Sequence, residues 1–96
     1  MARILIVDDE PEVRLLVREV LESRGHSIAE ARDVAEGREH LAVAGFDLVL
    51  CDIALPGETG LVLVRQVAAE LPETAIIMIS GAGEPAQADE ALALGA

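Results

Sequence analysis

Three carboxylates and one hydroxyl stand directly after short apolar runs of the chain. Asp8 and Asp9 follow the first run, Asp52 follows the third and Ser80 follows the fourth. Carboxylate oxygens suit hard cations such as Mg²⁺, which completes its coordination with water or phosphate oxygens. An Asp carboxylate can also accept a phosphoryl group, and a neighbouring hydroxyl can donate a hydrogen bond to it. These residues predict metal-assisted phosphoryl chemistry, provided that the fold brings them together.

Taken singly, each of these residues is a weak signal. An Asp at the end of a strand is often only a helix N-cap or a solvated loop residue. Ser80 alone is more typical of a turn, because Ser is common there. The prediction therefore depends on the four residues meeting in space, and so on the elements that position them.

Strands and helices alternate along the chain. Short, β-branched apolar runs are typical of buried parallel strands, and we expect strands at residues 4–7, 27–31, 46–51 and 75–79. Apolar residues spaced three and four apart indicate helices, which we expect to begin near Pro11, Asp33, Leu61 and Glu84 and to end near Arg24, Ala44, Leu71 and Gly95. Asp33 with Glu36 three residues later resembles a capping box.

This alternation predicts an α/β fold with a parallel sheet between two layers of helices. In such sheets ligands collect beyond the carboxyl ends of the strands, where the winding direction reverses. By analogy with flavodoxin-like proteins we expect the strand order 2-1-3-4. The first and third strands are then neighbours, so that Asp8, Asp9 and Asp52 converge.

Composition limits the class of protein. Residues 1–96 suit a single domain. A net charge of −11, with seven Arg and no Lys, repels nucleic acids and anionic membranes, so we expect direct binding to neither. Cys51 has no internal disulfide partner and reads as a reduced core residue. No apolar run reaches the roughly 18 residues of a membrane span and no signal peptide is evident, so we expect a cytoplasmic protein.

With these positions in place, the chain resembles the receiver domain of two-component response regulators over essentially its whole length. The hydrophobic strand followed by two acids appears as ILIVDDE at 4–10. The acid with Pro four and Gly eight residues later appears as DIALPGETG at 52–60. The small hydroxyl residue after the fourth strand appears as SG at 80–81.

This resemblance implies a CheY-like, flavodoxin-like fold in which Asp52 is the phosphoacceptor. It implies that Mg²⁺ is held by Asp8, Asp9, Asp52 and the backbone carbonyl of Ala54. Ser80 would contact the phosphoryl group and couple it to a conformational switch. The donor would be a phosphohistidine on a sensor histidine kinase or phosphotransfer protein. The domain would not be an enzyme towards other molecules, since it would catalyse only its own phosphorylation and dephosphorylation.

The chain departs from the family pattern at its end. A receiver domain has a fifth strand and helix, with a Lys and an aromatic switch residue on that strand, whereas this sequence stops at Ala96 and contains no Lys. We therefore expect a domain that is incomplete before its fifth strand. The fourth strand would be an exposed edge, and the first helix would expose apolar surface, both of which favour association with another chain or a homodimer.

Other functions compete with the phosphorylatable switch. A receiver-like interaction or dimerisation module that works without phosphorylation is the main alternative, favoured by the missing Lys. A phosphatase with Asp52 as its nucleophile would need a second acid at the position of Ala54. A nucleotide-binding flavodoxin-like protein would need a Gly-rich loop after the first strand, and none follows.

Overall fold

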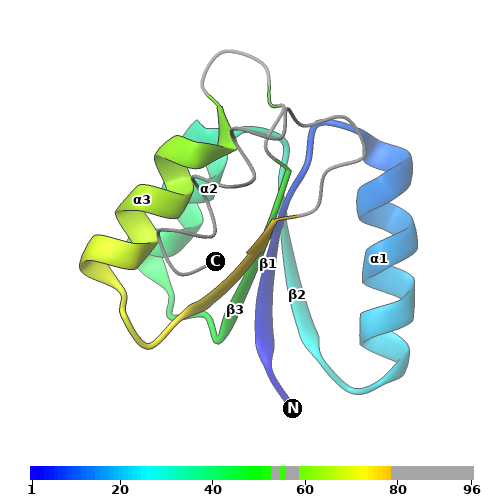
Figure 1. Ribbon diagram of the computed structural model, residues 1–96. Helices are drawn as coiled ribbons and strands as arrows, with labels where there is room; N and C mark the ends of the chain where they lie inside the picture. Colours follow the sequence, from blue (N-terminus) through cyan, green and yellow to red (C-terminus); the bar gives the residue numbers. More distant parts are fainter. Residues whose placement is uncertain (53–54, 56–58, 79–96) are drawn as a thin grey trace.

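The computed structural model describes residues 1–52, 55 and 59–78. In this part of the chain the strands are β1 (Arg3–Val7), β2 (Ser27–Ala31), β3 (Leu48–Cys51) and β4 (Ala75–Met78), and the helices are α1 (Pro11–Ser23), α2 (Val34–Val43) and α3 (Gly60–Glu70) (Figure 1). The expected ends lie within two residues of these bounds. Residue 79 and the expected last helix lie outside the described residues. None of the described helices is long and apolar enough to cross a membrane.

The described strands form one parallel sheet in the order β2-β1-β3-β4, which confirms the expected order. β1 is central and pairs with both β2 and β3. At the carboxyl end of β1, Val7 pairs with Ala31 on one side and with Cys51 on the other. The residues that follow Val7 and Cys51 therefore leave the sheet next to each other.

Helices cover both faces of the sheet: α1 lies on one face, and α2 and α3 lie on the other (Figure 1). Alternate residues of β1 serve the two faces. Leu5 and Val7 belong to the core beneath α2 and α3, whereas Ile4 and Ile6 are buried outside that cluster, on the side of α1. The core also contains buried aliphatic residues from α2, α3 and the other strands, namely Ala31, Val34, Val49, Leu63, Val64, Val67 and Ile76. Burying one such large side chain contributes about 1.5–3 kcal/mol, so this side of the sheet dominates the stability.

The apolar face of α1 is only partly covered. Val17 and Leu21 are half-buried against the sheet, but Leu16 is 64% exposed and Val20 is 48% exposed. Across the same face of the sheet, Ile77 on β4 is 51% exposed. The expected exposure of apolar surface on the first helix is therefore present, and none of the residues of α1 is fully buried.

Local signals explain where the helices begin and end. Pro11 occupies the first turn of α1, where a missing N–H costs no hydrogen bond. Gly25, just beyond the end of α1, has a φ of +89°, a conformation that favours glycine. The Asp33 carboxylate accepts a hydrogen bond from the backbone N–H of Glu36 at 2.8 Å, which confirms the predicted cap of α2. The Glu36 carboxylate, however, accepts from the N–H of Arg32 rather than from that of Asp33.

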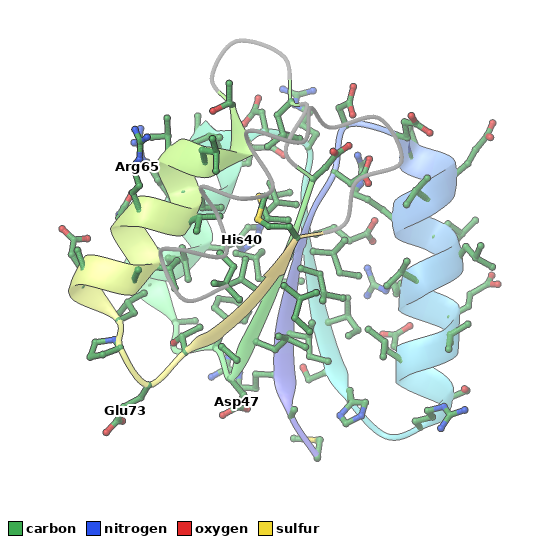
Figure 2. The ribbon with its side chains drawn as sticks, viewed as in Figure 1. His40, Asp47, Arg65 and Glu73 are labelled. Carbon is green, nitrogen blue, oxygen red and sulfur yellow. The ribbon has the colours of Figure 1, made fainter. Side chains whose placement is uncertain are left out.

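β3 begins at Leu48, two residues later than expected. The Asp47 carboxylate accepts the backbone N–H of Arg3 at 2.8 Å, and the N–H of Asp47 donates to the carbonyl of Arg3 at 2.8 Å. The carbonyl of Asp47 accepts the N–H of Ala75 at 3.0 Å. Regular pairing begins one residue later, between Ile4 and Leu48. Asp47 lies at the edge of the sheet where β3 begins, opposite the edge where β1 and β3 end (Figure 2).

Candidate functional site

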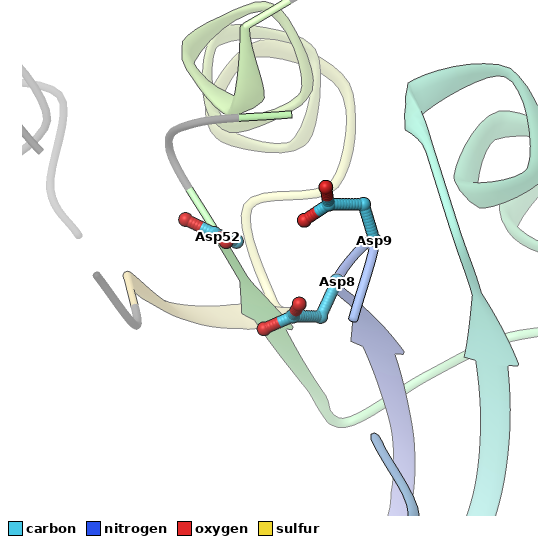
Figure 3. Close-up of side chains that lie close together, drawn as sticks. All are labelled: Asp8, Asp9 and Asp52. Carbon is cyan, nitrogen blue, oxygen red and sulfur yellow. The ribbon is translucent and has the colours of Figure 1, made fainter. Parts of the chain in front are cut away.

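The carboxylates of Asp8, Asp9 and Asp52 converge beyond the carboxyl ends of β1 and β3. One oxygen from each side chain lies within 4.8 Å of the others (Figure 3). The convergence follows from the register, since Val7 pairs with Cys51 and the backbone N–H of Asp52 donates to the carbonyl of Val7 at 2.9 Å. The expected meeting of the three acids is thus present in the structure.

The three carboxylates differ in their access to solvent. Asp8 is buried, with 4% of its surface exposed, whereas Asp52 is half-buried and Asp9 is exposed. Asp8 is also held from two directions: its N–H donates to the carbonyl of Ala31 at 3.0 Å, and its Oδ1 accepts the N–H of Glu10 at 2.8 Å. The cluster therefore has a fixed inner acid and opens to solvent through Asp9.

The chemistry of this donor set suits a hard divalent cation. Three carboxylates in one place repel one another, and a divalent ion removes that repulsion. The set consists of carboxylate oxygens alone, and the histidines do not belong to it. His26 accepts the N–H of Ala2 through Nδ1, and the ring of His40 lies 3.0 Å from the carbonyl of Glu30. Neither histidine is therefore part of the acid cluster.

Cys51 lies directly beside the cluster but faces the core. The pKa of its thiol is raised to about 12. Burial is the largest cause, and the negative charges of Asp52 and Asp8 add to it. The Sγ atom lies 3.4 Å from the carbonyl oxygen of Asp52, to which the thiol donates. At neutral pH the thiol is therefore protonated and serves as a core group, as the sequence suggested.

A surface hollow lies at the other end of the molecule. It has a volume of about 460 Å³ and is lined by residues 44–47 and 70–74. Asp47 belongs to it, and in Figure 2 both Asp47 and Glu73 lie at the edge of the sheet away from the acids. Because the three carboxylates are not among its lining residues, the hollow and the acid cluster are separate features.

The sequence profile described as "Response regulator receiver domain" matches residues 4–96. The chain belongs to this family. The receiver domain is similar to the response regulator protein PilR of Pseudomonas aeruginosa, with 42% identity over 92 residues that make up 96% of this chain and 21% of PilR. It is also similar to the transcriptional regulatory protein ResD of Bacillus subtilis, with 39% identity over 88% of this chain and 35% of ResD. The chain thus spans between a fifth and about a third of these relatives.

Solved structures agree with this assignment. A CheY-like receiver domain protein from Methanospirillum hungatei has a TM-score of 0.95 and 30% identity, over 100% of this chain and 77% of the other. The response regulator TrrA of Thermotoga maritima, solved in complex with Mg²⁺ and BeF, has a TM-score of 0.87 and 32% identity, over 98% of this chain and 81% of the other. The fold is therefore the expected CheY-like α/β fold.

Two residues near the acids were not given a structural role by the sequence. Gly60 of this receiver domain begins α3 directly against the main chain of Asp52. Arg14 reaches from α1 to the backbone carbonyl of Asp8 at 2.6 Å. In the sequence, Gly60 stood out only as part of the family motif. The one signal for Arg14 was that it is a positively charged residue of the first helix with acidic residues before and after it in the chain.

Two of the predicted site residues lie outside the described residues. These are Ala54, expected to offer a backbone carbonyl to the metal, and Ser80, expected to contact the phosphoryl group. Their roles stay predictions. The structure brings together Asp8, Asp9 and Asp52, which are the residues that the proposed chemistry needs most directly.

Proposed function

We propose that this receiver domain accepts a phosphoryl group on Asp52 in a Mg²⁺-dependent phosphorelay. The observation that supports this most directly is the convergence of Asp8, Asp9 and Asp52 within 4.8 Å in a chain that belongs to the receiver family. Asp52 is half-buried at the end of β3, so its carboxylate has a defined position and still has access to solvent.

In the proposed reaction a carboxylate oxygen of Asp52 attacks the phosphorus atom of a phosphohistidine on a sensor histidine kinase or phosphotransfer protein. An O–P bond forms, the N–P bond breaks, and the imidazole leaves with a proton. Mg²⁺ would neutralise charge on the acids and on the phosphoryl oxygens. We propose that Asp8, Asp9 and Asp52, with the carbonyl of Ala54, hold this ion, and that Ser80 donates a hydrogen bond to the phosphoryl group.

The proposal is tested by intact-mass analysis after incubation with acetyl phosphate and Mg²⁺. We expect one phosphoryl adduct, mapped to Asp52, and no adduct in Asp52→Asn. Asp47→Asn is the matched control, because it makes the same change on the other end of the same strand and keeps an oxygen that can accept from Arg3. Adduct formation in Asp52→Asn at the wild-type rate would refute the assignment.

A second function is favoured by a separate observation. Leu16, Val20 and Ile77 are about half exposed or more, and exposed apolar surface favours association. An interaction or dimerisation module that works without phosphorylation would use such surface. Light scattering of the wild type and of Asp52→Asn distinguishes the two functions. Equal self-association of both proteins, without a phosphoryl adduct in either, favours the interaction module.

A further inference from the structure

Arg14 connects the acid cluster to the two elements beside it. It lies in the second turn of α1, and its Nη1 donates to the backbone carbonyl of Asp8 at 2.6 Å. Its Nε donates to Glu30 Oε1 at 3.2 Å, at the carboxyl-terminal part of β2. The side chain of Arg14 is only 17% exposed, so both contacts are shielded from solvent. One guanidinium thus joins α1, β2 and the turn that follows β1.

The carbonyl that Arg14 holds has a particular place in the backbone. It belongs to the planar peptide unit that joins Asp8 to Asp9. Fixing this oxygen fixes the orientation of that plane, and with it ψ of Asp8 and φ of Asp9. The directions in which the two carboxylates leave the chain depend on these dihedral angles. A contact with a backbone atom therefore sets the relative placement of two carboxylates.

Apart from the Arg14 side chain, the turn is tied to α1 by the main chain, since the N–H of Arg14 donates to the carbonyl of Glu10 at 3.1 Å. Glu10 is the N-cap residue of α1, and its side chain makes no capping hydrogen bond. The Oδ1 atom of Asp8 accepts the N–H of Glu10, so the orientation of the Asp8 carboxylate and that of the turn are linked. The guanidinium is a rigid planar fork that can donate in two directions at once, which a Lys ammonium cannot reproduce with the same geometry.

Glu30 is in turn held by a second cation. Nη1 of Arg18 donates to Glu30 Oε2 at 2.6 Å, one helical turn beyond Arg14. Glu30 thus receives Arg14 on one carboxylate oxygen and Arg18 on the other. Of these two cations, Arg14 is the one that also contacts the turn with the acids.

We infer that Arg14 is a positioning residue for the acid cluster, which it serves by fixing the Asp8–Asp9 peptide against α1 and β2. The part of this inference that concerns metal affinity rests on the proposed function. The part that concerns the geometry of the turn does not, since it is carried by contacts within the protein.

The test compares Arg14→Gln and Arg14→Lys with Arg18→Gln. The Arg18 variant removes the same charge from the same face of α1 and from the same partner, Glu30, but leaves the Asp8 carbonyl contact in place. Two quantities are measured: hydrogen exchange at the Glu10 amide by NMR, and Mg²⁺ affinity by titration. Thermal unfolding of each variant shows whether it is folded.

We expect both Arg14 variants to exchange the Glu10 amide several-fold faster than the wild type and to bind Mg²⁺ about tenfold more weakly, as is typical when a group that orients a metal ligand is removed. Arg18→Gln should change either quantity less than about twofold, since surface pairs contribute little. Failure of Arg14→Lys to restore the wild-type values identifies the fork, rather than the charge, as the cause.

Unchanged exchange in both Arg14 variants would overturn the inference, and so would equal effects of Arg14→Gln and Arg18→Gln. Absence of Mg²⁺ binding in the folded wild type would instead refute the metal site of the proposed function. In that case the exchange data alone still decide whether Arg14 fixes the turn.

Discussion

Gly60 lies against the main-chain carbonyl of Asp52. A Cβ atom on Gly60 would overlap the carbonyl oxygen of Asp52, and it would lie 3.0 Å from the Asp52 carbonyl carbon and 3.0 Å from Sγ of Cys51. The overlapping atom belongs to the backbone and cannot rotate away. The first turn of α3 and the end of β3 are therefore as close as a residue without a side chain allows.

We predict that Gly60→Ala displaces Asp52 and destabilises the fold by about 1–3 kcal/mol, the usual cost of overpacking. Urea unfolding gives the change in stability, and intact-mass analysis with acetyl phosphate gives the change in adduct formation. Gly45→Ala is the control, because a Cβ there would meet nothing within 4 Å. Equal stability of the two variants would contradict the steric argument.

The cap of α2 offers a second prediction. Asp33→Ala removes the acceptor of the Glu36 N–H and should lower the free energy of unfolding by about 1 kcal/mol. Thr59→Ala is the matched control, since Thr59 is the N-cap residue of α3 but its side chain makes no capping hydrogen bond. Urea titration of both variants gives the loss in free energy of unfolding for each. Equal losses in Asp33→Ala and Thr59→Ala would show that the Asp33 cap does not stabilise the fold.

A third prediction concerns the exposed acid of the cluster. Asp9→Ala should weaken Mg²⁺ binding, and in metal-free buffer it should be at least as stable as the wild type, because one of three repelling charges is gone. Mg²⁺ should therefore raise the melting temperature of the wild type more than that of Asp9→Ala. Glu39→Gln removes a charge from an exposed position on α2 and should respond to Mg²⁺ as the wild type does. Identical Mg²⁺ responses of wild type and Asp9→Ala would place the ion elsewhere.

The thiol of Cys51 gives a prediction for alkaline pH. Burial raises its pKa from an ordinary 9.0 to about 12, so the folded state keeps the proton when the unfolded state has lost it. The resulting stabilisation is fully present below pH 9 and is lost as the pH rises towards 12. Urea unfolding at several pH values should show the wild type losing stability relative to Cys51→Ala above pH 9. Rapid labelling of the native thiol by iodoacetamide at pH 9 would contradict this prediction.

The ends of the elements were predictable because short-range chemistry sets them. Pro11 has no N–H to lose in a first helical turn, Gly25 adopts a positive φ, and Asp33 accepts the N–H of Glu36. The three acids of the site were predictable for a related reason, since each directly follows a strand and parallel strands end at the same edge of a sheet.

Contacts between elements were not predictable in the same way. Arg14 and Glu30 are 16 residues apart, and their meeting depends on how α1 lies on the sheet. The contact of Gly60 with Asp52 depends on how closely α3 approaches β3, which no local pattern specifies. The start of β3 also differed from the expectation, since the first residue of β3 that pairs with β1 is Leu48, and this register depends on the tertiary structure.

The central place of β1 has a consequence for how the protein reaches its native state. Arg3 and Asp47, which are joined where β1 and β3 come together, are 44 residues apart in the chain. Contacts of such long sequence separation form slowly, because the loop between them must close first. During synthesis β1 therefore cannot pair with β3 until β3 has left the ribosome. Asp8 and Asp9 cannot approach Asp52 before that pairing. A nascent chain thus lacks the acid cluster, which is present only once β1 and β3 have paired.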